Sequence, residues 1–331
     1  MSKQKILAML RKSPDAHISG ESMSRTLGIS RAAVFKAIKS LREDGYEIAA
    51  APKRGYLLKT APDSLTEGEI RPYLSVSHVG STLKVFPTID STNNYLKLNA
   101  ADTASGTVVI ANEQTGGRGR RGRSFESPKD TGIYMSALVR PDLPPAEALN
   151  FTAFVAVAIC EGIEAATGLK PGIKWTNDIV LGGKKVCGIL TEMAIEGESG
   201  LLQYIITGIG INVNQSEEDF PEDIRHIAGS LAMAAGEPVR RGRLAAELTN
   251  ALDRMYEAWI HGGGDYLERY RAACLTTGKE VKLIRASGAV EDAFAERVDD
   301  DFGLIVRHPD GRREKVTSGE VSVRGLWGYV D

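Results

Sequence analysis

The stretch Gly116–Arg123 restricts the fold more than any other part of the sequence, because its eight residues are four glycines and four arginines. Glycine destabilises a helix or strand when it lies in the interior, and neighbouring guanidinium groups repel one another. We therefore expect a loop whose N–H groups and arginines surround an anion. The loop lacks the spacing of a P-loop, and the strand expected after it excludes a dinucleotide-binding turn. A loop that contacts RNA or DNA fits equally well, and a solvated loop remains an alternative.

Length and composition indicate an ordinary globular protein. The 331 residues are 42% hydrophobic and 25% charged, which suits two or three domains with sizeable cores. No apolar run approaches the roughly 20 residues of a membrane span, and the N-terminal residues do not resemble a signal peptide. We therefore expect a cytoplasmic protein without a membrane partner. The cysteines, Cys160, Cys187 and Cys274, lie far apart, so buried free thiols are expected, with no disulfide and no metal site.

Charge is concentrated at the N-terminus. Residues 1–60 contain 12 Lys and Arg against 5 Asp and Glu, a balance of +7, while the remaining chain carries −9. A small basic unit on an acidic body is the distribution expected when one domain binds a polyanion. A basic helix pair that is merely solvated is the alternative.

Three short amphipathic helices are expected within residues 1–60. The first covers Lys3–Arg11, the second lies between Ser19 and Gly28, and the third follows Ser30. Serine suits the N-cap position, and glycine suits a helix C-terminus. The third helix has apolar residues at i, i+4 and i+7, which indicates one buried face. These residues are Val34, Ile38 and Leu41.

The other face of the third helix is basic. Two helices joined by a glycine-containing turn make a helix-turn-helix, and two strand-like runs around residues 52–55 predict a wing. Residues 1–60 therefore resemble the winged helix-turn-helix domains of bacterial regulators. The resemblance implies DNA contacts from Ser30, Arg31, Ala32, Lys36, Lys39, Lys53 and Arg54. A protein-docking module with the same fold remains an alternative.

Residues 61–81 are expected to be a linker, followed by an α+β domain at 82–275 and a third domain at 276–331. The central domain should contain a mixed sheet with helices on one side, including a helix at Pro145–Thr167. Its later strands, at 172–176, 186–195 and 201–211, are joined by short glycine-rich connections that favour antiparallel hairpins. The strand-like runs after residue 276 predict a small β-barrel of the SH3-like type.

Four motifs in the central domain resemble those of biotin–protein ligases. The GRGRxGR pattern is matched at 117–123, KWPNDI at 174–179, K[LV]xGIL at 185–190 and GIGINV at 208–213. Together with the winged helix, they make the whole chain similar to the bifunctional type that is both ligase and biotin-responsive repressor. The resemblance implies a class II synthetase-like catalytic domain. Two departures are Thr176, where the family has Pro, and Phe125, where Trp is common.

The resemblance also implies a two-step reaction. Biotin and ATP, with Mg²⁺, would give biotinyl-5′-AMP and pyrophosphate, and a lysine of a biotin carboxyl carrier protein would then displace AMP. The expected catalytic residues are Lys185, Arg120 and Asp178. A repressor of this type is expected to form a homodimer on operator DNA when the adenylate is bound.

Two further sets of residues follow from the resemblance. Biotin-binding is expected for Ser91, Thr92, Asn93, Gln114, Gly117, Arg118, Gly119, Arg120, Lys185 and Gly188. Nucleotide-binding is expected for Arg118, Arg120, Arg121, Arg123, Phe125, Asn177, Asn212 and Arg324.

Simpler interpretations exist for several of these residues. Ser91 is also a plausible helix cap, Asp178 a carboxylate that stabilises a turn, and Arg324 a surface partner of Glu320. Lys185 taken alone would be a cation on a hairpin surface. For the whole protein, a regulator that only senses a small ligand and a lipoate-type ligase are the alternatives.

Overall fold

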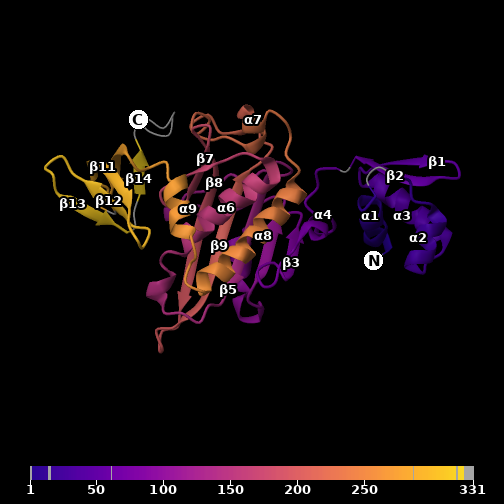
Figure 1. The fold of residues 1–331 in the computed structure, drawn as a ribbon, viewed down its shortest axis with the longest axis horizontal. Coiled ribbons are helices and arrows are strands. Elements are labelled where there is room, and N and C mark those ends of the chain that lie inside the picture. The colour runs from indigo at the N-terminus through magenta and orange to yellow at the C-terminus, as the bar shows by residue number, and fades with distance from the viewer. Residues whose placement is uncertain (1, 14–15, 61, 286, 318–319, 324–331) are drawn as a thin grey trace. The chain divides into compact units, whose positions relative to one another are not determined.

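The computed structural model describes every residue except 1, 14–15, 61, 286, 318–319 and 324–331. The chain divides into two compact units, Met1–Pro72 and Tyr73–Asp331. Each unit has its own hydrophobic core. Figure 1 shows the course of the chain through both units.

Unit 1 has the predicted three helices and a wing. The helices are α1 (Ser2–Arg11), α2 (Gly20–Leu27) and α3 (Arg31–Glu43), and strands β1 (Glu47–Ala51) and β2 (Gly55–Thr60) pair antiparallel. The Ser30 hydroxyl accepts a hydrogen bond from the N–H of Ala33 at 3.1 Å, so the predicted N-cap is confirmed. The predicted apolar face of α3 is buried in the core. The expectation of a winged helix-turn-helix is thereby confirmed.

The wing is attached to the helices through a close backbone approach. Ile18, in the segment before α2, exchanges backbone hydrogen bonds with Tyr56 of β2 at 2.8 and 2.9 Å. Gly55 has a φ of +105°, and a Cβ atom there would lie 2.2 Å from the carbonyl oxygen of Ile18. Only glycine can occupy this position without moving the wing.

The described residues of the expected linker, 62–81, are divided between the two units. A short helix, α4 (Glu67–Ile70), belongs to unit 1, where Glu69 accepts a hydrogen bond from Tyr46 and forms an ion pair with Arg11. Residues 73–79 belong to unit 2, where the backbone N–H groups of Ser77, His78 and Val79 donate to the Asp253 carboxylate. The chain therefore passes from one unit to the other at Pro72–Tyr73.

A seven-stranded mixed sheet forms the centre of unit 2, with strand order β3-β4-β5-β9-β8-β7-β6. Among the described strands of this sheet, β3 and β4 pair in parallel and the other neighbours pair antiparallel. The strands are β3 (Thr82–Phe86), β4 (Thr107–Ala111), β5 (Gly132–Val139), β6 (Gly172–Lys174), β7 (Asp178–Leu181), β8 (Lys184–Ile195) and β9 (Leu202–Asn212). The antiparallel hairpins predicted for the later strands are confirmed, and β7 is an additional short strand within them.

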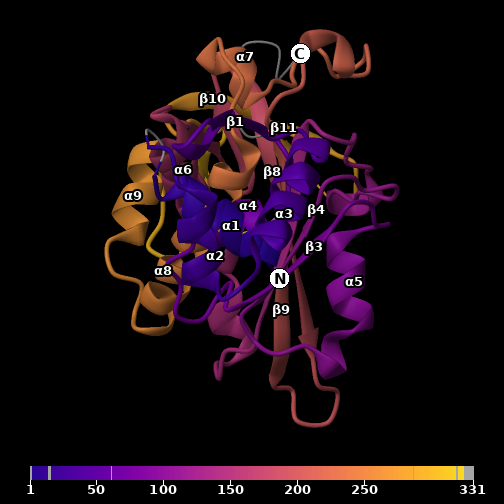
Figure 2. The same ribbon diagram turned by 90° about the vertical axis from the view of Figure 1, so that its right-hand side faces the viewer.

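Helices cover both faces of this sheet, so the expectation that they cover one side was wrong. Helix α5 (Thr92–Leu98) packs Leu96 against Val109, Leu138 and Ile206 on one face. The long helices α6 (Phe151–Thr167) and α8 (Arg241–Ile260) pack together on the other, where Thr152 of α6 donates a hydrogen bond to Thr191. Figure 2 shows α5 on the opposite side of the sheet from α6, α8 and α9 (Tyr266–Ala273).

Within the described part of the chain, one helical stretch, Pro145–Thr167, is long and apolar enough to span a membrane. Most of it is buried in the core of unit 2, which accounts for its apolar composition. The stretch is a 3-10 turn, Pro145–Ala148, followed by α6, and not one continuous helix as predicted. All three cysteines are free thiols, and burial raises the pKa of Cys187 and Cys274 above the usual value.

The C-terminal strands form a separate antiparallel sheet within unit 2, which agrees with the predicted small barrel. Its order is β13-β12-β11-β10-β14. The strands are β10 (Lys279–Ile284), β11 (Val290–Val298), β12 (Leu304–Arg307), β13 (Arg313–Val316) and β14 (Glu320–Val323). The indole N–H of Trp175 donates a hydrogen bond of 2.9 Å to the Phe302 carbonyl, so this sheet is attached to the loop between β6 and β7.

Candidate ligand pocket

The pocket lies on the α5 face of the central sheet and has a volume of about 290 Å³. Three glycines, Gly188, Gly208 and Gly210, are on this face in adjacent register positions of β8 and β9. A Cβ atom at Gly208 would lie 2.3 Å from Oδ1 of Asn93, and one at Gly210 would lie 2.5 Å from the Phe125 ring. The glycines therefore leave the space above the sheet that larger side chains would fill.

The glycine–arginine loop folds into a small hairpin beside the pocket. The Gly119 N–H donates to the Arg123 carbonyl at 2.7 Å, and the Phe125 N–H donates to the Gly117 carbonyl at 3.0 Å. A Cβ atom at Gly117 would lie only 2.3 Å from the Phe125 carbonyl oxygen, so the hairpin cannot close around a larger residue. As a result Arg118, Arg120 and Arg123 all line the pocket. The side chain of Arg121 lies outside the described part of the structure.

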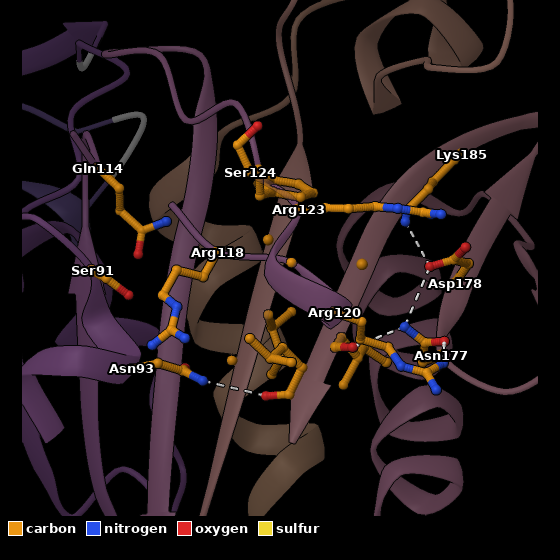
Figure 3. A pocket seen from close by; sticks show the side chains of 18 of the residues that line it. Ser91, Asn93, Gln114, Arg118, Arg120, Arg123, Ser124, Asn177, Asp178 and Lys185 are labelled. Atoms are coloured by element: carbon orange, nitrogen blue, oxygen red, sulfur yellow. Dashed lines mark hydrogen bonds and ion pairs between the residues drawn. The ribbon is translucent and has the colours of Figure 1, made fainter. Parts of the chain in front are cut away.

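Polar contacts connect this loop with the β7–β8 hairpin. Nη1 of Arg120 donates to Oδ1 of Asn177 at 2.7 Å, and Nδ2 of Asn177 donates to the Ile189 carbonyl at 2.9 Å. The Lys185 ammonium lies 2.6 Å from Oδ1 of Asp178. Figure 3 shows Arg120 directed at Asn177 and Lys185 directed at Asp178. Two cations from distant parts of the chain are therefore held at one end of the pocket.

The other end of the pocket, next to α5, is lined mainly by neutral side chains that hydrogen-bond to one another, with Arg118 beside them, where its Nη1 donates to Oδ1 of Asn94 at 3.0 Å (Figure 3). Oε1 of Gln114 accepts from both the N–H and the hydroxyl of Thr92, at 2.9 and 3.1 Å. The Ser136 hydroxyl lies 2.6 Å from both Thr92 Oγ1 and Asn93 Oδ1. Ser91, which caps α5 through the Asn94 N–H, also lines the pocket, so its capping role and its predicted site role are compatible.

The Asn93 side chain is held by an acid, because its Nδ2 donates to Oε2 of Glu192 at 3.0 Å. Burial alone would raise the pKa of Glu192, but hydrogen bonds from Asn93 and Lys97 hold that pKa below its usual value. Glu192 therefore stays ionised at neutral pH and fixes the orientation of the Asn93 amide. No motif in the sequence singles out Glu192.

Most of the predicted ligand-binding residues meet in this pocket, but some do not line it. Asn212 is buried outside the lining, where its Nδ2 donates to the Gly229 carbonyl at 3.1 Å. Gly117 acts through the backbone of the loop, and Arg324 lies outside the described residues. Lining residues that sequence analysis did not assign are Ser124, Met135, Lys174, Trp175, Ile189, Leu190, Gly208, Ile209, Gly210 and Ile227. The alternation of glycine in GIGIN was the signal for the pocket floor.

The cations predicted to contact DNA are presented to solvent in unit 1. On α3 the residues Arg31, Lys36 and Lys39 are exposed, as are Ala32 and the N-cap Ser30. Lys53 and Arg54 lie exposed in the turn between β1 and β2. Positive side chains at both the helix and the wing tip can contact a phosphate backbone.

One other cluster in the described residues has metal-binding side chains. Glu291, His308 and Glu314 place ligand atoms within 4.8 Å of one another in the C-terminal sheet. Arg285 already pairs with both carboxylates, at 2.8 Å to Glu291 and 2.6 Å to Glu314. The hydrogen bond from Arg285 lowers the pKa of Glu314 to about 2. The cluster is therefore an ion-pair network, and it contains no lining residue of the pocket.

A winged helix-turn-helix followed by a sheet whose glycine floor faces an arginine-rich loop defines a DNA-binding unit joined to a ligase-type domain. Residues 2–57 match the model of an HTH domain, and residues 85–212 match the biotin/lipoate A/B protein ligase family. The sequence is 36% identical to the bifunctional ligase/repressor BirA of Bacillus spizizenii over 320 residues, which cover 96% of this chain and 97% of that protein. It is 33% identical to the protein of the same name from Escherichia coli, over 92% of each chain.

Solved structures agree with these relatives. Biotin protein ligase from Aquifex aeolicus in complex with biotin and ATP is 28% identical, with a TM-score of 0.63 over 74% of this chain and 99% of that one. The chain belongs to the family of bifunctional ligase/repressor proteins.

Proposed function

We propose that this protein joins biotin and ATP into biotinyl-5′-AMP, transfers biotin to a lysine of a biotin carboxyl carrier protein, and represses transcription on operator DNA. The observation that supports the ligase most directly is the contact set Arg120–Asn177 and Asp178–Lys185 at one end of a glycine-floored pocket. The relatives named above carry both activities in their names.

The first step requires cations because it joins two anions. The biotin carboxylate oxygen attacks the α-phosphorus of ATP, and the bond from that phosphorus to the leaving pyrophosphate breaks. Lys185, Arg120 and Arg123 line one end of the pocket, where they reduce the repulsion between carboxylate and phosphate (Figure 3). Asp178 holds the Lys185 ammonium at this position before the substrates arrive.

The end of the pocket next to α5 suits the ring of biotin. Its ureido group needs both donors and acceptors in an otherwise apolar space, and Thr92, Asn93 and Gln114 offer both. These three residues are fixed by hydrogen bonds to one another or to Ser136. The pocket thus has an end rich in neutral hydrogen-bonding groups for the ring, and an end with Lys185, Arg120 and Arg123 for the carboxylate.

The second step forms an amide. The carrier's lysine nitrogen attacks the carbonyl carbon of the adenylate, the bond from this carbon to the phosphate oxygen breaks, and AMP leaves. The attacking ammonium must first lose a proton, and a carboxylate at the pocket edge can orient the amine and accept it. Asp178 is the carboxylate among the described lining residues.

Mg²⁺ is proposed for the first step because it usually binds one or two carboxylates together with substrate phosphates. The Asp178 carboxylate is the protein group that would hold it, since Oδ1 of Asn177 already accepts a hydrogen bond from Arg120. This small donor set fits a metal whose remaining ligands come from ATP and water. When bound, Mg²⁺ would neutralise phosphate charge.

Repression requires more than one DNA-binding unit. One recognition helix reads few base pairs, so we propose that the adenylate-bound protein forms a homodimer that places two copies of α3 on a two-part operator. A cytoplasmic location is proposed, since ATP, carrier protein and DNA are all found there.

Transfer of radiolabelled biotin to a carrier domain tests the enzyme. We expect labelled carrier only when biotin and ATP are both present, and no transfer of lipoate in a parallel reaction. A protein that binds biotin but never labels the carrier would be the ligand-sensing regulator, and preferred lipoate transfer would indicate the lipoate-type ligase.

Sedimentation and gel-shift measurements test the repressor. Biotin plus ATP should shift the protein from monomer to dimer and tighten operator binding. An operator affinity that does not change when biotin and ATP are added would disprove this coupling. Absence of DNA binding in every ligand state would indicate that unit 1 is a protein-docking module.

A further inference from the structure

Helix α3 carries a large apolar side chain in water. Phe35 is 60% exposed, and within the described part of unit 1 it is the only large hydrophobic residue recorded as exposed. The core of unit 1 does not need it, because Val34, Ile38 and Leu41 on the same helix are each 1% exposed and fill that core. A phenylalanine in this position gains free energy only when something covers it.

The surroundings of Phe35 are cationic. The exposed residues of α3 occur at i, i+1, i+4, i+5, i+8, i+11 and i+12, which is one stripe along the helix. This stripe consists of Arg31, Ala32, Phe35, Lys36, Lys39, Arg42 and Glu43. Glu43 is its one acid and lies 3.9 Å from the Lys39 ammonium, so four of the five charged residues are cations. Phe35 therefore lies in the middle of a positively charged surface. Charge complementarity favours a polyanion over an apolar protein surface as the molecule that covers it.

The position of Phe35 along the helix also fits DNA. In a helix-turn-helix, the N-terminal part of the second helix reaches base edges while flanking cations contact phosphates. Phe35 is the fifth residue of a helix that begins at Arg31. A phenyl ring offers no hydrogen bond, so in the major groove it can recognise only an apolar group, and the C5 methyl of thymine is the apolar group exposed there.

We propose that Phe35 is a specificity-determining residue of the DNA-binding unit and that it reads the methyl group of one thymine in each operator half-site. This inference rests on the proposed DNA-binding function. It assigns sequence discrimination to Phe35, while Lys36 and Lys39 supply affinity without discrimination.

The test uses the full-length protein with biotin and ATP and a library of random-sequence DNA duplexes. Wild-type protein selects its preferred duplex from this library. Each thymine of that duplex is then replaced in turn by deoxyuridine, which removes only the methyl group. We expect wild-type binding to weaken by about tenfold at one thymine per half-site. Phe35→Ala should bind the unmodified duplex about tenfold more weakly and show no further loss at that thymine.

Control measurements distinguish recognition of the thymine methyl group from DNA binding that does not depend on sequence. Lys39→Gln should weaken binding to selected and random duplexes alike and keep the deoxyuridine effect. Phe35→Ala should keep the wild-type affinity for random duplexes, which shows that unit 1 is folded, and its biotin transfer to a carrier domain should be unchanged, which shows that unit 2 is intact. Phe35→Tyr keeps the aromatic ring. If this variant again binds more weakly when that thymine is replaced by deoxyuridine, the result supports contact between the ring and the methyl group.

Several outcomes would overturn the inference. If Phe35→Ala retained the full deoxyuridine effect, another residue would read the methyl group. If the variant lost self-association and kept DNA discrimination, Phe35 would be a protein contact. If wild-type protein selected no sequence at all, the proposed repressor function would fail as well, and this result is distinct from the other two.

Discussion

Helix α3 and the glycine–arginine loop both carry clustered cations that we propose bind an anionic ligand, but they position those cations differently. On α3, Arg31, Lys36 and Lys39 are exposed because the opposite face of the helix is buried in the core. In the loop, the arginines are directed by a hairpin whose glycines permit close backbone contacts, and Arg120 is already bonded to Asn177.

This difference has a physical consequence. Exposed cations interact with phosphates through water and are screened by salt, whereas cations that line a pocket act on a ligand that they partly enclose. Unit 1 should therefore bind a long polyanion in a salt-dependent manner. Unit 2 should bind one small anion tightly and with defined geometry.

The largest expected effect comes from removing one of the two regions. Deletion of residues 1–72 should abolish DNA binding and leave biotin transfer measurable, because the cations of α3 and the wing are lost together. Deletion of residues 1–60 is a poorer design, since Glu69 and Ile70 of α4 would lose their partners in unit 1. Gel shift and carrier labelling measure the two activities. Retained DNA binding would show that the DNA-binding site lies in unit 2.

In the pocket, Lys185→Gln should lower the rate of adenylate formation roughly 100-fold or more, because its charge acts on the transition state. Biotin affinity should change far less, since the residues proposed for the ring lie at the Thr92–Gln114 end. Pyrophosphate release and biotin binding are the two measurements. The matched control is Lys184→Gln, because Lys184 is adjacent in sequence but does not line the pocket. Equal rates in both variants would refute the role of Lys185.

A smaller effect is expected for Arg120→Gly. The adenylate should dissociate roughly 10- to 100-fold faster, because a charge-assisted hydrogen bond contributes about 1.5–3 kcal/mol. Arg120→Lys should restore only part of the retention, since an ammonium keeps the charge but loses the planar fork of donors. The dissociation rate of preformed biotinyl-5′-AMP is the measurement. An unchanged rate would mean that Arg120 only stabilises the loop through Asn177.

Much of unit 1 could be predicted from the sequence because its rules are local. Helix caps such as Ser30, the apolar spacing of Val34, Ile38 and Leu41, and the turn at 52–55 depend on neighbouring residues alone. Phe35 was missed because an apolar residue in a helix is normally counted with the core, and only the packed structure shows that it is exposed.

Many of the residues that line the pocket of unit 2 could be predicted from the sequence, but the contacts between them could not. Motifs supplied Arg120, Asn177, Asp178 and Lys185, and all four line one cavity. No local pattern could show that Asp178 holds Lys185, or that helices lie on both faces of the sheet, since both depend on packing between distant segments. The hydrogen bond from Trp175 to Phe302 likewise joins segments that are distant in the sequence, so no local pattern predicts it.

The smallest expected effect is that of one exposed cation. Lys39→Gln should weaken DNA binding only a few-fold at moderate salt, but it should reduce the slope of log affinity against log salt concentration by about 1, because one fewer phosphate is neutralised. Fluorescence anisotropy over roughly 50–200 mM salt measures this slope. Biotinyl-5′-AMP binding by the wild-type protein should vary far less over the same range, since Arg120 and Lys185 act inside the pocket. Equal salt dependence for the two ligands would remove the distinction between the two regions, because both sets of cations would then be acting through solvent.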